Sequence, residues 1–121
     1  MAKFNEKGFI VKLDPHEVIV VGTNLEGRHA GGAAKQAYED FGAVWGIGVG
    51  RQGQSYAIPT MPPLTLKEIG HYIREFVEYA RLHRDIEFLV TPIGTGIAGF
   101  TETQMETVWP KILPDNITRL L

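Results

Sequence analysis

The strongest constraint on the fold is an uninterrupted run of β-branched residues. Residues 18–21 read Val-Ile-Val-Val, and Gly22 ends the run. β-Branched side chains favour strands, and a strand that is apolar on both faces belongs inside a sheet with helices on each side. The run therefore predicts a parallel or mixed sheet in an α/β protein.

Other segments alternate between strand and helix patterns. Strands are expected at residues 9–11, 17–22, 54–60 and 85–93, with a short last strand within 115–121. Helices are expected at residues 33–41, 65–82 and 101–113, the last two opened by capping boxes at Thr65/Glu68 and Thr101/Gln104. Strands that alternate with helices predict a three-layer α/β/α sandwich with a mixed central sheet, forming one domain over residues 1–121.

The composition excludes several classes of protein. The chain has no cysteine, which excludes disulfides, zinc–cysteine sites and thiol nucleophiles. Its net charge of −2 provides no basic field for nucleic acid, and its apolar runs are far shorter than the roughly 20 residues of a membrane helix. His71 and Glu75 are four residues apart with no third ligand nearby, so we expect no metal site. We expect a soluble cytoplasmic protein that needs no cofactor.

Two glycine-rich segments carry the main functional signal. Residues 22–32 and 94–99 each follow an apolar strand and precede a helix. The N–H groups at a helix start are unpaired and attract anions, and glycine lets the backbone approach a phosphate closely. Two such loops at one edge of a sheet could hold a diphosphate between them. The alternative is that these glycines only allow tight turns.

Several segments, in order, resemble the macrodomain family, whose members bind ADP-ribose and related nucleotides. Residues 18–24 are similar to the family strand that ends in N-A-A-N, and residues 30–37 to its first glycine-rich loop. Residues 55–60 resemble its Y-V-I-H-T-V strand. Residues 92–100 resemble P-x-I-S-T-G-x-[YF]-G-[YF], the most specific of these motifs. The chain looks like a compact macrodomain of the bacterial or phage kind.

The resemblance implies a set of ligand-binding residues. Gly31, Gly32 and the 94–99 backbone would bind the diphosphate, while Asn24 and Phe100 would meet the distal ribose. The full expected set is Thr23, Asn24, Arg28, Gly31, Gly32, Gly94, Thr95, Gly96, Ile97, Ala98, Gly99 and Phe100.

The chain also departs from the family pattern. Macrodomains usually carry G-D-[IV]-T before the first matched strand, and its aspartate binds the adenine amino group. Here residues 6–11 read Glu-Lys-Gly-Phe-Ile-Val. Gly31 stands where many hydrolytic members have an aspartate, and Ala98 replaces the usual aromatic residue.

Three polar residues of the first glycine segment are candidates for catalysis. Asn24 could position a water molecule, Glu26 could act as a general base, and His29 is of the residue type best suited to acid–base chemistry near neutral pH. Their structural alternatives are an Asx turn and solvated surface groups. We therefore expect a binding protein for ADP-ribose or a related nucleoside diphosphate. A hydrolase of ADP-ribosyl or related phosphoester linkages and a protein-interaction scaffold without nucleotide binding remain as alternatives.

Overall fold

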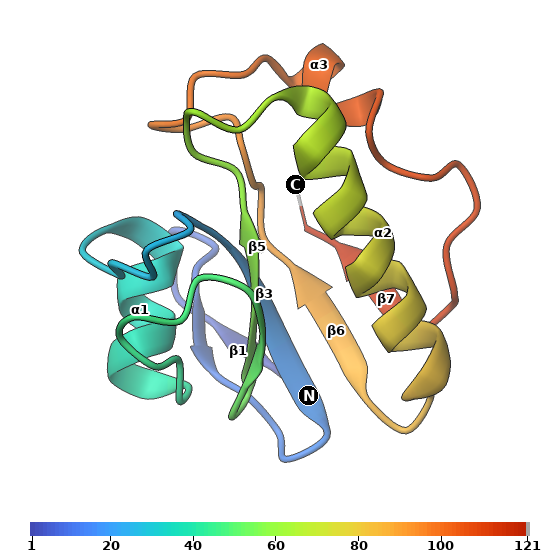
Figure 1. Cartoon of the computed structure of the whole chain (residues 1–121). Coiled ribbons are helices and arrows are strands. Elements are labelled where there is room, and N and C mark those ends of the chain that lie inside the picture. The colour runs from blue at the N-terminus through green and yellow to red at the C-terminus, as the bar shows by residue number, and fades with distance from the viewer. Residues whose placement is uncertain (121) are drawn as a thin grey trace.

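The computed structural model describes residues 1–120 and contains a mixed five-stranded sheet (Figure 1). From edge to edge its strands are β4 (Gly50–Gln52), β5 (Ser55–Pro59), β3 (Glu17–Thr23), β6 (Glu87–Val90) and β7 (Ile117–Arg119). Strands β5, β3, β6 and β7 are parallel, and β4 pairs with β5 in the antiparallel direction. The carboxyl ends of the four parallel strands therefore meet at one edge of the sheet.

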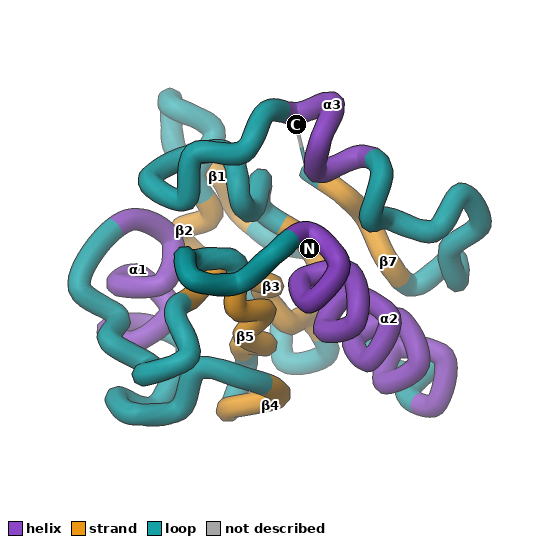
Figure 2. Tube along the Cα trace, turned by 45° about the horizontal axis from the view of Figure 1, so that its top comes forward, coloured by secondary structure: helices purple, strands orange, loops and turns teal. Residues whose placement is uncertain are grey.

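Helices cover both faces of this sheet, as Figure 2 shows. One face carries α1 (Gly32–Asp40) and a hairpin of β1 (Lys3–Phe4) and β2 (Ile10–Lys12). The other carries α2 (Leu66–Leu82) and α3 (Glu102–Glu106). None of the helices within residues 1–120 is long and apolar enough to cross a membrane.

Strand β3 explains the two-sided core. Val18 and Val20 belong to the apolar cluster under α2, while Ile19 and Val21 belong to the cluster under α1. All four side chains are buried. The prediction of a strand buried on both faces, in a mixed sheet of an α/β protein, is confirmed.

The helix starts differ in a way that bears on function. Thr65 and Thr101 cap α2 and α3 with the predicted capping boxes. Helix α1 begins after Gly31, whose backbone is extended, and no side chain caps it. Its first turn also lacks an acidic residue.

Some element predictions need correction. Helix α3 ends at Glu106 and not near residue 113, because Trp109 turns into the core and Pro110 has no N–H to continue the helix. Strand β6 covers fewer residues than the predicted 85–93. Strands β1 and β4 were not predicted. The last predicted strand is β7, and Leu121 lies outside the described residues.

Candidate functional site

A pocket of about 390 Å³ lies at the carboxyl ends of β3 and β5, and we call it the central pocket. Its walls come from the first loop (residues 24–31), the start of α1 and the second loop (residues 91–101). The two glycine segments are thus brought together. The expected residues that line it are Thr23, Asn24, Arg28, Gly31, Gly32, Gly94, Gly96, Ile97 and Ala98.

Asn24 organises the first loop through its side chain. Its Oδ1 accepts a hydrogen bond from the Arg28 N–H at 2.8 Å, and its Nδ2 donates to the Arg28 carbonyl at 3.2 Å. The Gly27 N–H also donates to the Asn24 carbonyl at 3.1 Å. These bonds hold the backbone of Arg28 at the rim of the central pocket. The exposed Arg28 side chain forms no ion pair with any residue from 1 to 120.

The segment that follows α1 supports the first loop from behind. The Thr23 hydroxyl donates to the Gly48 carbonyl at 2.6 Å, and the Gly46 N–H donates to the Gly27 carbonyl at 2.9 Å. A Cβ atom on Gly48 would overlap the Asn24 carbonyl oxygen, so this close approach requires glycine. This supporting contact accounts for Gly48, one of the glycines in the segment between α1 and β5.

His29 belongs to this support and does not line the central pocket. The ring is 1% exposed, and its Nε2 lies 2.8 Å from the Val44 carbonyl oxygen. That contact requires Nε2 to carry hydrogen. Trp45 lies edge-on to the ring, with centroids 6.3 Å apart. The structure therefore places His29 in the packing behind the loop.

The start of α1 supplies free backbone donors to the central pocket. The first intrahelical bond runs from the Lys35 N–H to the Gly31 carbonyl at 3.2 Å. The N–H groups of Gly32, Ala33 and Ala34 therefore have no partner inside the helix. All three residues line the pocket. Unpaired N–H groups and the positive end of the helix dipole favour a bound anion.

The second loop closes the opposite wall. Its shape is fixed by hydrogen bonds from the Phe100 N–H to the Gly94 carbonyl and from the Gly99 N–H to the Gly96 carbonyl, both at 3.0 Å. Gly94 is buried, and a Cβ atom there would overlap the Met105 sulfur. Gly94 is thus needed for packing, whereas Gly96 is exposed at the rim.

Two glycines at the central pocket have no structural reason to be glycine. Gly31 has an extended φ of −159°, and Gly96 is not in the left-handed region. A Cβ atom on either residue would meet nothing within 4 Å. Their missing side chains leave the pocket open and its backbone accessible.

Other expected site residues lie elsewhere. Glu26 is exposed and lines none of three pockets: the central pocket, one beside the β1–β2 hairpin and one under α3. Gly99 and Phe100 do not line them either, and Phe100 packs against the core under α2. Thr95 lines the two neighbouring pockets but not the central one.

Thr60 and Met61 also line the central pocket, although neither was predicted from the sequence. Thr60 directly follows β5, and its N–H donates to the Thr23 carbonyl at 2.9 Å. Its place at a strand end was a usable signal, but only once β5 was known to pair with β3.

A larger pocket of about 660 Å³ adjoins the central pocket, and we call it the hairpin pocket. It lies between α1, the turn of the β1–β2 hairpin and the ends of β6 and β7. The two pockets share Gly32, Ala33, Pro92 and Gly96, so they adjoin each other, and we call the pair the groove. Among residues 1–120, no aspartate or glutamate lines either pocket, whereas Arg28 and Lys7 do.

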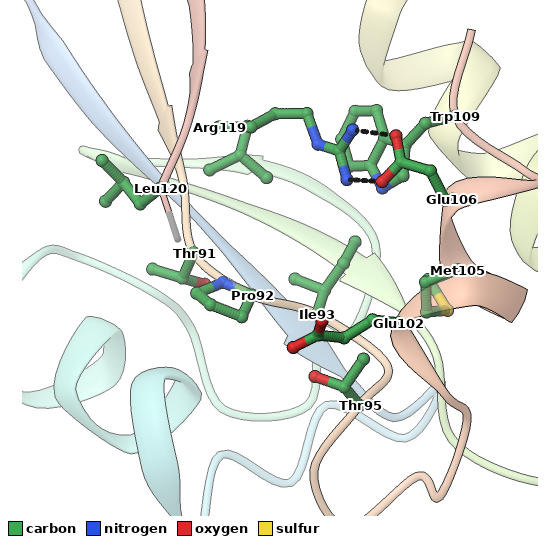
Figure 3. A pocket seen from close by; sticks show the side chains of 11 residues that line it. Thr91, Pro92, Ile93, Thr95, Glu102, Met105, Glu106, Trp109, Arg119 and Leu120 are labelled. Atoms are coloured by element: carbon green, nitrogen blue, oxygen red, sulfur yellow. Dashed lines mark hydrogen bonds and ion pairs between the residues drawn. The ribbon is translucent and has the colours of Figure 1, made fainter.

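A third pocket of about 300 Å³ lies under α3 (Figure 3). The Arg119 guanidinium makes two hydrogen bonds to the Glu106 carboxylate, at 2.8 and 3.0 Å, and its Cζ lies 4.5 Å from the Trp109 ring centroid. Hydrogen bonding to Arg119 holds the pKa of Glu106 below its ordinary value. These contacts hold α3 against β7, so we assign the residues of this pocket a structural role.

No group of three or more His, Asp or Glu side chains in residues 1–120 could hold a metal ion. No family model, curated protein or solved structure matches the chain.

Proposed function

We propose that this protein binds ADP-ribose or a related nucleoside diphosphate, with the diphosphate in the central pocket. One observation carries the proposal: the uncapped start of α1 and the open glycine of the second loop face the same pocket. Backbone N–H groups on one side and Arg28 at the rim offer donors to phosphate oxygens. The resemblance to macrodomains is consistent with this use of the groove.

Binding is better supported than hydrolysis. Both polar atoms of the Asn24 side chain are hydrogen-bonded to Arg28, and His29 is held against Val44. Glu26 lies outside the groove. Of the three candidates for catalysis, Asn24 and His29 therefore hold the structure of the first loop, and Glu26 is a surface residue.

Titration calorimetry tests the proposal with a panel that consists of ADP-ribose, NAD and the diphosphates of adenosine, inosine, uridine and cytidine. We expect saturable binding of at least one compound, with a Kd that is roughly micromolar. Gly96→Glu should abolish it, because it adds bulk and negative charge at the rim.

The matched control is Ile112→Glu, which adds the same charge at a residue that is 87% exposed and lines none of the pockets. It should bind like the wild type. The proposal fails if no compound of the panel gives heat or a thermal shift, or if Gly96→Glu binds as well as Ile112→Glu.

A further inference from the structure

The segment between α1 and β4 contacts the first loop but has no regular structure of its own. We call residues 44–49 the support segment; it belongs to no helix or strand. Its turn is closed by a hydrogen bond from the Ile47 N–H to the Val44 carbonyl at 3.1 Å. A segment outside helices and strands keeps one shape where other groups satisfy and fix its backbone.

The Gln52 side chain fixes the support segment. Its Oε1 accepts a hydrogen bond from the Val44 N–H at 2.7 Å, and its Nε2 donates to the carbonyls of Ile47 at 3.2 Å and Gly50 at 3.3 Å. An N–H only donates and a carbonyl only accepts, so these partners determine which end of the amide is the oxygen. Gln52 is 6% exposed. One buried amide thus bonds to the start and the middle of the support segment and to the residue just beyond its end.

Gln52 is itself fixed by the sheet. It is the last residue of β4, where it pairs with Ser55 of β5. The buried Ser55 hydroxyl donates to the Gln52 carbonyl at 2.8 Å. Strand β5 in turn pairs with β3 in the middle of the sheet. Gln52 therefore connects the support segment to the core of the molecule.

Three hydrogen bonds join the support segment to the first loop and to the residue before it. Their partners on the loop side are the Thr23 hydroxyl, the Gly27 carbonyl and the His29 Nε2. Val44 takes part directly, because its carbonyl bonds to His29 while its N–H bonds to Gln52. A change at Gln52 should therefore reach the first loop through the support segment.

We propose that Gln52 positions the first loop for phosphate binding, although it does not line the central pocket. It acts through the support segment, which is bonded to Gly27, the residue before Arg28. The expected effect on a ligand rests on the proposed function, whereas the effect on the loop does not. A loop that has its binding shape for only about a tenth of the time binds about tenfold more weakly.

Gln52→Glu tests the proposal with almost no change of shape. The carboxylate still accepts from the Val44 N–H but donates no hydrogen bond to the two carbonyls that Gln52 now satisfies. We expect amide hydrogen exchange at Gly46 and Arg28, measured by NMR without ligand, to become about tenfold faster, because exchange follows the open fraction of the loop. The amides of β3 should change little. By calorimetry, the Kd of a compound from the panel that binds the wild type should rise about tenfold.

Gln54→Glu is the matched control, two residues away. The Gln54 Nε2 also donates to two carbonyls, those of Asp14 at 2.9 Å and Glu17 at 3.1 Å, and Gln54 lies outside the support segment and the central pocket. This variant loses comparable hydrogen bonds elsewhere in the fold. It should leave ligand affinity unchanged and have no selective effect on exchange at Gly46 and Arg28.

Gln52→Met removes the same bonds without adding a charge, and it should reproduce the local effect if Gln52→Glu does not fold. The proposal is wrong if exchange at Gly46 and Arg28 stays as in the wild type, or if it rises equally in β3, since the role of Gln52 is then only structural. It is also wrong if Gln54→Glu weakens binding as much as Gln52→Glu. Failure of every compound to bind the wild type would instead overturn the proposed function, and the exchange rates would still decide whether Gln52 positions the loop.

Discussion

At the scale of single residues, glycine has two distinct roles in this chain. At Gly27 and Gly48 a Cβ atom would overlap neighbouring backbone, so these residues allow two segments to touch. At Gly31 and Gly96 a Cβ atom would meet nothing, and both residues line the central pocket. Substitution should therefore affect folding at the first pair and binding at the second.

Alanine substitutions separate these roles. We expect Gly31→Ala and Gly96→Ala to change the free energy of unfolding by less than about 0.5 kcal/mol. Each should weaken nucleotide binding by about tenfold because the new methyl group stands between the ligand and the backbone. Gly48→Ala should instead destabilise the fold by about 1–3 kcal/mol. Denaturant unfolding and calorimetry measure both effects, and a strongly destabilised Gly31→Ala protein would contradict the assignment.

Tyr56 gives a prediction for alkaline pH. Burial, with a further contribution from the Glu75 carboxylate, raises the pKa of Tyr56 from 10.0 to about 12. Because the pKa is higher in the folded chain than in the unfolded chain, the stability from neutral Tyr56 is complete below pH 10 and declines as the pH rises towards 12. The absorbance difference between wild type and Tyr56→Phe should titrate near pH 12, and a midpoint near 10 would contradict this.

At the scale of the elements, capping separates α1 from the other helices. At the start of α2 the Thr65 side chain accepts a hydrogen bond from the Glu68 N–H, and the Glu68 side chain accepts one from the Thr65 N–H. Hydrogen bonding to Thr65 holds the pKa of Glu68 below its ordinary value. Helix α1 has no equivalent side chain. A bound phosphate would supply the acceptor that the chain itself does not provide.

Removal of the α2 cap has a predictable cost. Thr65→Ala loses the acceptor for the Glu68 N–H and should lower the free energy of unfolding by about 1 kcal/mol. Lys67→Ala, one position from Glu68 and exposed, should remain within about 0.5 kcal/mol of the wild type. Chemical denaturation of both variants measures the difference. Equal stability of Thr65→Ala and wild type would show that the capping box is not stabilising.

Local patterns predicted most elements but not all of their ends. The β-branched run at residues 18–21 and the buried residues of α2, which recur at helical spacing, are strong signals because many neighbouring residues favour the same element. Helix α3 stops early because Trp109 gains burial by leaving the helix. Strand β4 was missed because it begins with Gly50 and glycine has low strand propensity, which its pairing with β5 overrides.

At the scale of the whole molecule, the order of the strands decides the site. The sequence indicated two glycine loops at the carboxyl ends of strands. It could not indicate that β3 lies between β5 and β6, since strand pairing depends on contacts between distant segments. That order brings Thr60 beside Thr23, and the packing of the hairpin brings Lys7 into the same groove. Thr60 and Lys7 therefore could not be assigned to the site from local sequence patterns, because only the tertiary structure brings them there.

The two tryptophans lie in surroundings that differ enough to be observed separately. Trp45 is 51% exposed and follows Val44, which holds His29 behind the first loop, whereas Trp109 is 6% exposed and covered by Arg119. A water-soluble quencher such as iodide should therefore reach the first indole and not the second. The chain thus carries two intrinsic fluorescent reporters: the quenched emission follows the first loop, and the protected emission follows the contact between α3 and β7.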